Sequence, residues 1–191
     1  RGCLSQPWID TGLPDDALHS HPRHLLWSPD SRFLATETGL SGPVAVFPAG
    51  KGVAVWEQFD PYEGMAWSPD GTIIAAGADA VTGIQLFRAA DGKLVGSWKG
   101  QALTSALAYS PDGSILASAG FDGTIVLRDV ATGAQIGPVL TTSSTAQAAY
   151  LNFDAAGHLI AATRDDRVDL DVAGERERHA RENHVVTEEA E

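Results

Sequence analysis

The residues best suited to chemistry near the start of the chain are three histidines and two aspartates. His19, His21 and His24 follow the aspartates at 15–16 after a short gap. Imidazole and carboxylate groups bind zinc or nickel, so this cluster is a candidate metal site. However, Pro22 interrupts it, no cysteine joins it, and no helical or strand pattern surrounds it. We therefore expect a solvated loop here, with no metal ion and no other cofactor.

The rest of the sequence lacks the motifs of common catalytic sites. Asp169 and Asp171 match the first two ligands of a calcium-binding loop, but Ala173 and Ala180 stand where further acidic ligands are required. The sequence contains no glycine-rich phosphate loop and no Gly-x-Ser-x-Gly nucleophile elbow. We therefore expect that this chain is not an enzyme and has no catalytic residues.

Aromatic and acidic side chains at 57–63 form a candidate protein-binding surface. Phe59, Asp60, Tyr62 and Glu63 belong to it. Exposed aromatic residues beside charged ones are typical of contact surfaces between proteins. The alternative is that Phe59 and Tyr62 fold back onto their own sheet.

The charge balance limits the classes of partner. The chain has 25 acidic and 13 basic side chains, which gives a net charge of −12. An acidic surface repels the phosphate groups of nucleic acids and anionic membranes, and no apolar run is long enough to span a bilayer. The single cysteine, Cys3, excludes an internal disulfide and fits a reducing compartment. We expect a protein partner, no nucleic acid, no membrane and a cytoplasmic location.

A turn motif that recurs along the chain predicts the elements that position these residues. Trp-Ser-Pro-Asp at 27–30 returns at 67–70, as Tyr-Ser-Pro-Asp at 109–112, and in a divergent form at 153–157. The leading aromatic residues are therefore 40, 42 and 44 residues apart. Repeats of this length are typical of solenoids and propellers.

Short apolar runs follow each copy of the motif and predict strands. The Ser-Pro-Asp sequence favours a type I turn, and Asp91-Gly92 and Thr132-Gly133 favour hairpins. With the strand that carries the aromatic residue, a full repeat contains four strands. The further strands are expected at 33–36, 44–47 and 53–56, at 73–76, 84–87 and 94–98, at 115–118, 125–127 and 135–139, and at 159–162 and 168–170. The predicted fold is all-β, built of propeller blades of four antiparallel strands.

The third repeat resembles the WD-repeat family. Residues 108–133 match the family pattern most closely, with Arg128 where the family has the Trp of its Trp-Asp pair, followed by the expected Asp129. In that family a His, a Ser, an Asp and the Trp form a buried hydrogen-bond chain. The resemblance therefore implies Ser118 and Asp122 as the structural polar pair of this repeat. It also implies a non-catalytic protein-protein interaction or scaffolding module.

A second function stays open, because TolB-type and peptidase-associated propellers share the Trp-Ser-Pro-Asp-Gly turn. In that alternative the chain is the propeller part of a larger enzyme or signalling protein, peptidase- or kinase-associated, whose catalytic domain lies outside this sequence. A hydrolase or kinase domain encoded beside these residues would favour it.

The repeats divide the chain into three parts. These are an N-terminal segment at 1–23, about three and a half repeats at 24–173, and a charged polar tail at 174–191. So few repeats favour an open or partial propeller, although a strand at 6–13 could close a ring of four blades. In an open propeller we expect apolar, bare faces near 44–56 and 159–170, and self-association through open blade edges.

Overall fold

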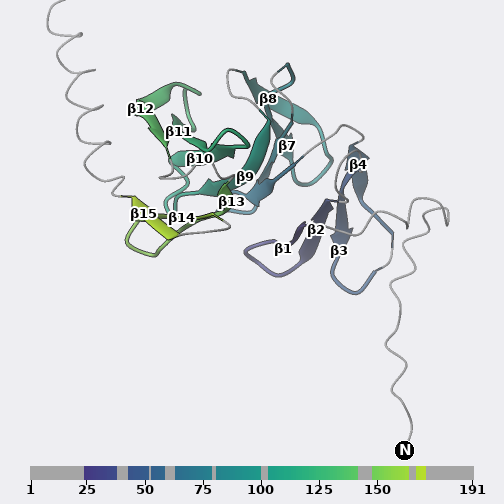
Figure 1. Cartoon of the computed structure of the whole chain (residues 1–191). Coiled ribbons are helices and arrows are strands. Elements are labelled where there is room, and N and C mark those ends of the chain that lie inside the picture. The colour runs from purple at the N-terminus through teal and green to yellow at the C-terminus, as the bar shows by residue number, and fades with distance from the viewer. Residues whose placement is uncertain are drawn as a thin grey trace, which may run out of the picture.

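The structure is a computed structural model that describes residues 24–37, 43–51, 53–58, 63–78, 81–99, 103–141, 148–163 and 167–170. These residues form fifteen strands in four antiparallel sheets, and none of them lies in a helix. Figure 1 shows the sheets following one another in chain order around an arc. The prediction of an all-β fold is confirmed. The described residues contain no helix that is long and apolar enough to span a membrane.

We number the sheets I to IV from the N-terminus. Sheet I contains β1 (His24–Trp27), β2 (Phe33–Glu37), β3 (Val44–Pro48) and β4 (Trp56–Gln58). Sheet II contains β5 (Met65–Trp67), β6 (Ile73–Gly77), β7 (Ile84–Arg88) and β8 (Leu94–Trp98). Sheet III contains β9 (Thr104–Tyr109), β10 (Ile115–Gly120), β11 (Thr124–Asp129) and β12 (Gln135–Thr141). Sheet IV contains β13 (Ala148–Phe153), β14 (Leu159–Thr163) and β15 (Arg167–Leu170), so the described part of the fourth repeat has three strands, as predicted.

The fourth strand of sheet I lies later in the chain than the expected range of 53–56. Strand β4 begins at Trp56, which pairs with Val46 of β3. Val53 and Val55 are exposed and belong to the connection before the strand. Their apolar character predicted a strand, but this connection is longer than the hairpin turns of sheets II and III. The amide of Val55 donates to the carbonyl of Val46 at 2.6 Å, and the strand itself begins at Trp56.

The Ser-Pro-Asp turns have the predicted geometry. In sheet II the amide of Gly71 donates to the carbonyl of Ser68 at 2.9 Å, the bond that closes a type I turn. The same bond joins Ser31 to Ser28, Gly113 to Ser110 and Gly157 to Asp154. Gly71 has a φ of 69°, and Ser31 holds the equivalent position with a φ of 58°. The first turn therefore carries backbone strain that the glycines of the other three avoid.

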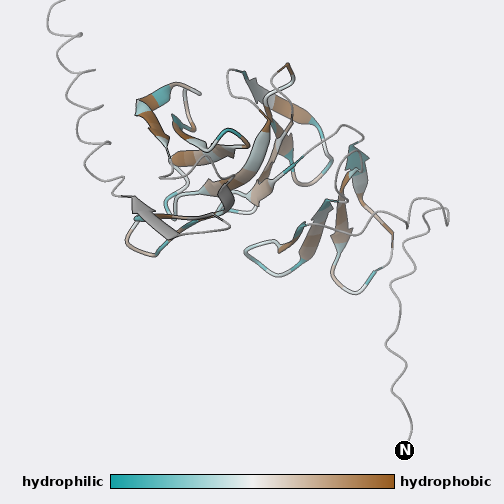
Figure 2. Ribbon diagram, in the orientation of Figure 1, coloured by the Kyte–Doolittle hydropathy of each residue, from teal (hydrophilic) through white to brown (hydrophobic). Residues whose placement is uncertain are grey.

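Apolar side chains from successive sheets meet at three interfaces. Sheets I and II share Val44, Val46, Trp56, Trp67, Ile74 and Phe87. Sheets II and III share Ile84, Leu86, Leu107 and Leu116, and sheets III and IV share Ile115, Leu127, Phe153, Leu159 and Ala161. None of these clusters of described residues joins sheet I to sheet IV, so the arc is not closed and is consistent with a partial propeller. Figure 2 shows the hydrophobic residues along the strands and many of the hydrophilic ones in the turns.

Sheet IV differs from the other sheets in the register of its first hairpin. In sheet III Tyr109 pairs with Leu116, whereas in sheet IV the equivalent Phe153 pairs with Leu159. The connection between the paired residues is one residue shorter in sheet IV. A shift of one residue turns every side chain of a strand to the opposite face, so Leu159 and Ala161 of β14 point toward sheet III.

The expectation of bare apolar faces near 44–56 and 159–170 is wrong at its principal residues. Val44, Val46 and Leu159 are completely buried, and Trp56 is buried at 9% exposure. Val44, Val46 and Trp56 of sheet I face sheet II, and the shifted register turns Leu159 toward sheet III. Other predicted segments lie outside the described residues. These are the N-terminal segment, the closing strand predicted at 6–13, the calcium-like loop after Leu170 and the tail.

Candidate interaction surfaces

The surface predicted at 57–63 is described only in part. Phe59, Asp60 and Tyr62 lie outside the described residues. The amide of Glu63 donates to the carbonyl of Gly77 at 2.7 Å, which places Glu63 at the end of sheet II where β5 begins. The role of these four residues in partner binding stays a prediction.

Ser118 and Asp122 occupy different environments in sheet III. Ser118 is completely buried in β10, and its hydroxyl donates to the carbonyl of Val126 at 3.3 Å. Asp122 is exposed in the turn before β11, where its carboxylate accepts hydrogen bonds from the hydroxyl and amide of Thr124 at 2.7 and 3.1 Å. These bonds lower the pKa of Asp122 below its usual value. The hydrogen-bond chain implied for this pair stays a prediction.

Arg128, which stands at the position of the family Trp, links two sheets. The side chain is buried at 8% exposure. Its guanidinium donates to the carbonyl of Gly133 at 3.2 Å and to that of Lys99 at 3.1 Å. Lys99 follows β8 of sheet II, so the bond joins sheet III to sheet II. Burial lowers the pKa of Arg128, but a guanidinium still carries its charge near neutral pH.

Glu37 is a buried carboxylate that the sequence analysis did not single out. It is completely buried at the end of β2. Its Oε2 accepts hydrogen bonds from Nδ1 of His24 at 2.7 Å and from the amide of Gly64 at 3.2 Å. Its Oε1 is buried without a partner among the described residues. The equivalent positions in sheets II and III hold Gly77 and Ala119. The signal in the sequence that could have identified Glu37 is therefore an acidic residue at a strand end where the other repeats have a small residue.

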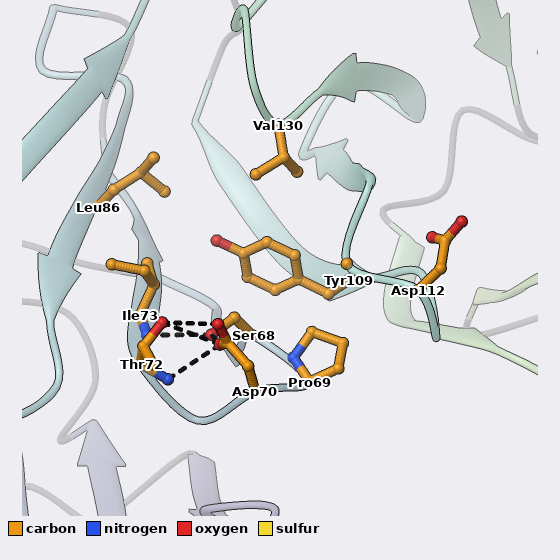
Figure 3. A pocket seen from close by; sticks show the side chains of 10 residues that line it. Ser68, Pro69, Asp70, Thr72, Ile73, Leu86, Tyr109, Asp112 and Val130 are labelled. Carbon is orange, nitrogen blue, oxygen red and sulfur yellow. Dashed lines mark hydrogen bonds between the residues drawn. The ribbon is translucent and has the colours of Figure 1, made fainter.

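A pocket lies between sheets II and III, on the side of the Ser-Pro-Asp turns. Its volume is about 460 Å³. Apolar walls come from Ile73, Leu86 and Val130, and the turns of the two sheets contribute Asp70 and Asp112. Figure 3 shows the ring of Tyr109 in the middle of the pocket, with its hydroxyl directed toward Leu86 and Ile73. A smaller pocket of about 130 Å³ occupies the same place between sheets III and IV.

The electrostatics of the larger pocket combine an ionised acid with a neutral phenol. The carboxylate of Asp70 accepts hydrogen bonds from the hydroxyl of Ser68 at 2.6 Å and from the amide of Thr72 at 3.0 Å, and these bonds lower its pKa. Burial, together with the charge of Asp70, raises the pKa of Tyr109 well above its usual value. Among the described residues the hydroxyl of Tyr109 has no hydrogen-bond partner. The pocket is therefore lined by an ionised carboxylate and a neutral phenol.

The described residues hold no group of three or more His, Cys, Asp or Glu side chains placed to bind a metal ion. Of the histidines considered as metal ligands, His19 and His21 lie outside the described residues. His24 is described, and its Nδ1 lies against Glu37.

Comparison with known proteins identifies one repeat. Residues 92–129 match the family model of the WD domain, G-beta repeat. The match begins in the turn before β8 and ends with the last residue of β11, so it covers the outer strand of sheet II and three strands of sheet III. A comparison with curated proteins found no match. The chain thus carries a WD repeat, set in an arc of antiparallel sheets consistent with WD-repeat propeller blades.

Proposed function

We propose that the chain is a non-catalytic protein-interaction module, and that the pocket between sheets II and III binds a basic segment of a partner protein. The observation that supports this proposal is the composition of the pocket. It combines an aromatic ring, apolar walls and acidic turns on a protein with a net charge of −12. WD repeats typically serve as interaction modules, and the match at 92–129 includes Tyr109 and Asp112.

An arginine side chain of the partner fits this chemistry. Its aliphatic stem can lie on Ile73 and Leu86, and its guanidinium can stack on the ring of Tyr109. Ser68 and the amide and hydroxyl of Thr72 bond mainly to Oδ1 of Asp70, and Oδ2 is contacted by the Thr72 hydroxyl alone. Because an ionised carboxylate offers about four lone-pair sites, Oδ2 keeps acceptor capacity for the guanidinium. The acidic surface also raises the rate at which a basic partner meets the protein.

The proposal is tested with a labelled Gly-Ser peptide that contains two arginines, compared with the same peptide carrying glutamine instead. Fluorescence anisotropy at low salt is expected to show binding of the arginine peptide only. Asp70→Asn and Tyr109→Leu are each expected to weaken binding about tenfold, as for the loss of one charged or stacked contact. Raising the salt concentration is also expected to weaken it, because exposed charges are screened.

Asp30→Asn is the matched control. Asp30 accepts the same turn hydrogen bonds from Ser28 and Arg32 in sheet I, but it does not line the pocket. Binding that is unchanged in Asp30→Asn and weakened in Asp70→Asn supports the proposal. Equal effects of the two substitutions, or no preference for arginine over glutamine, would exclude the pocket as the site.

A further inference from the structure

The aromatic residue that leads each repeat packs against the preceding sheet. Trp67 of sheet II is 9% exposed, and its Nε1 donates to the carbonyl of Leu26 in sheet I at 3.1 Å. Tyr109 of sheet III packs with the apolar cluster shared with sheet II. Phe153 of sheet IV is 8% exposed within the cluster shared with sheet III. The same contact therefore forms at all three internal interfaces.

The first member of this series, Trp27, is exposed. Trp27 and Leu25 are each 57% exposed. Side chains alternate between the two faces of a strand, and the intervening Leu26 packs against the cluster shared with sheet II. Leu25 and Trp27 therefore lie on the opposite face of β1. In sheets II, III and IV the corresponding face packs against the preceding sheet. We call the face marked by these two residues the leading face.

The other end of the arc has a complementary face. Leu151 and Phe153 of β13 pack toward sheet III. By the same alternation Tyr150 and Asn152 lie on the opposite face of β13, and Tyr150 is 68% exposed. The shifted register that turns Leu159 inward leaves the partly exposed Ile160 on this outer side of β14. We call the face with Tyr150, Asn152 and Ile160 the trailing face.

We propose that two copies of this chain associate head to tail, with the leading face of each copy stacked on the trailing face of the other. The contact continues the interface that already repeats inside the chain. Asn152 precedes Phe153 as Leu26 precedes Trp27, so its carbonyl holds the position that accepts a hydrogen bond from Trp67 at the first internal interface. Trp27 of the second copy supplies the matching indole donor.

The number of sheets favours a closed pair. The described residues of each copy form four sheets, so a pair that is joined at both ends contains eight such sheets. Propellers typically have about four to eight blades. Two head-to-tail contacts related by a twofold axis close the ring and leave neither apolar face exposed, whereas an unclosed arrangement would grow into a filament. This surface is separate from the pocket between sheets II and III, so its test is independent of the proposed function.

Light scattering coupled to size-exclusion chromatography, over a range of concentrations of the full chain, is the first experiment. The expected mass is twice 20.1 kDa, falling toward the monomer on dilution. Trp27→Glu and Tyr150→Glu are each expected to give monomers. Both side chains are more than half exposed, so the folded monomer is expected to persist, which circular dichroism checks. Leu94→Glu is the control, because Leu94 is 48% exposed on the outer strand β8 and lies on neither face.

Mixing the two monomeric variants distinguishes head-to-tail contact from other arrangements. The Trp27→Glu copy keeps its trailing face, and the Tyr150→Glu copy keeps its leading face. An equimolar mixture is therefore expected to recover a dimer through one intact contact. A mixture that stays monomeric would show that a leading face does not bind a trailing face, and a Tyr150→Glu variant that stays dimeric by itself would indicate contact between two leading faces; either result would overturn the proposal. A wild-type chain that is monomeric at every concentration, or a dimer that only Leu94→Glu disrupts, would also overturn it.

Discussion

The joint between sheets I and II and the joint between sheets II and III share one contact. In both, a tryptophan of an outer strand lies against the hairpin glycine of the next sheet. Trp56 contacts the turn at Gly92 and donates its Nε1 to the carbonyl of Ala89 at 2.7 Å. Trp98 lies against Gly133. A Cβ added to these glycines would lie 2.6 Å from the ring of Trp56 and 2.5 Å from that of Trp98.

The two joints differ in the charged group that each one buries. The first joint buries the carboxylate of Glu37, which accepts from Gly64 of the next sheet. The second buries the guanidinium of Arg128, which donates to Lys99 of the previous sheet. The repeat therefore supplies the tryptophan contact twice, while each joint adds its own charged bond. Substitutions at the tryptophan contact and at Glu37 or Arg128 separate the contributions of these two kinds of contact to the stability of each joint.

The largest expected effect follows from Glu37→Ala in the first joint. Removing the carboxylate leaves the amide of Gly64 and the ring of His24 without their acceptor. The unsatisfied buried amide of Gly64 lowers the free energy of unfolding by about 1 to 3 kcal/mol, and the cavity left by the truncated side chain lowers it further. Urea denaturation measures the change. Glu37→Gln is the control and is expected to cost less, because its amide oxygen can still accept from Gly64. A change within the error of the extrapolation for Glu37→Ala would show that the first joint does not depend on this bond.

The tryptophan contact is tested by Gly92→Ala and Gly133→Ala. Both positions have positive φ, 68° and 73°, and both lack room for a Cβ. Backbone strain of about 1 to 2 kcal/mol adds to overpacking of about 1 to 3 kcal/mol. Gly50→Ala is the matched control, because Gly50 has a φ of 73° and nothing within 4 Å of its added Cβ. Thermal denaturation should rank Gly50→Ala as the mildest of the three. Equal losses for all three would mean that only the backbone matters and that the contact does not hold the joints.

A smaller effect is expected from Arg128→Met in the second joint. Methionine keeps the apolar packing of the buried stem and removes the desolvated charge, so the two changes offset each other. We expect a change of about 1 kcal/mol or less in the free energy of unfolding. Arg88→Met tests an exposed arginine, whose ion pair with Asp91 at 3.0 Å should contribute little. A loss for Arg128→Met as large as that for Glu37→Ala would show that both joints depend on their charged bond.

The smallest effect concerns pH. Hydrogen bonds from Ser68 and Thr72 lower the pKa of Asp70 from its ordinary value of 3.8. The stabilisation from the ionised carboxylate is therefore present above pH 3.8 and is lost as the pH falls through the lower pKa of the folded state. The melting temperature of wild type should exceed that of Asp70→Asn at pH 6, and the difference should shrink below pH 4. A difference that grows on acidification would contradict the direction of this pKa shift.

Much of the fold could be predicted because the turn motif repeats. Ser-Pro-Asp and the aromatic residue before it mark one position in each sheet, and apolar runs mark the strands that follow. The motif does not specify which face a strand presents. In sheet IV one residue fewer in the first connection turns Leu159 inward, and no apolar pattern reports that shift. The apolar run at 53–56 likewise predicted a strand, but Val53 lies in the connection before β4 and is exposed.

The candidate site was less predictable, because it depends on contacts between repeats. The repeat marks Tyr109 as the leading aromatic residue of a strand, and only its hydroxyl distinguishes it from Trp67 and Phe153. The pocket around it needs residues of two sheets. Glu37 likewise acts through Gly64, which lies beyond the predicted loop at 57–63. Aligning the repeats of one chain shows which residues occupy equivalent positions. It does not show which residues of different repeats contact each other.

The most direct test of the proposed function maps the binding site of the arginine peptide by nuclear magnetic resonance. A titration of the isotope-labelled full chain would follow the backbone amides as peptide is added. We predict shifts confined to 68–73 and 109–113, with Leu86 and Val130, and none in the corresponding turn of sheet I. Shifts centred on 57–63 would instead support the surface predicted from Phe59 to Glu63. Those shifts, or an absence of shifts at saturating peptide, would contradict the assignment of the pocket as the binding site.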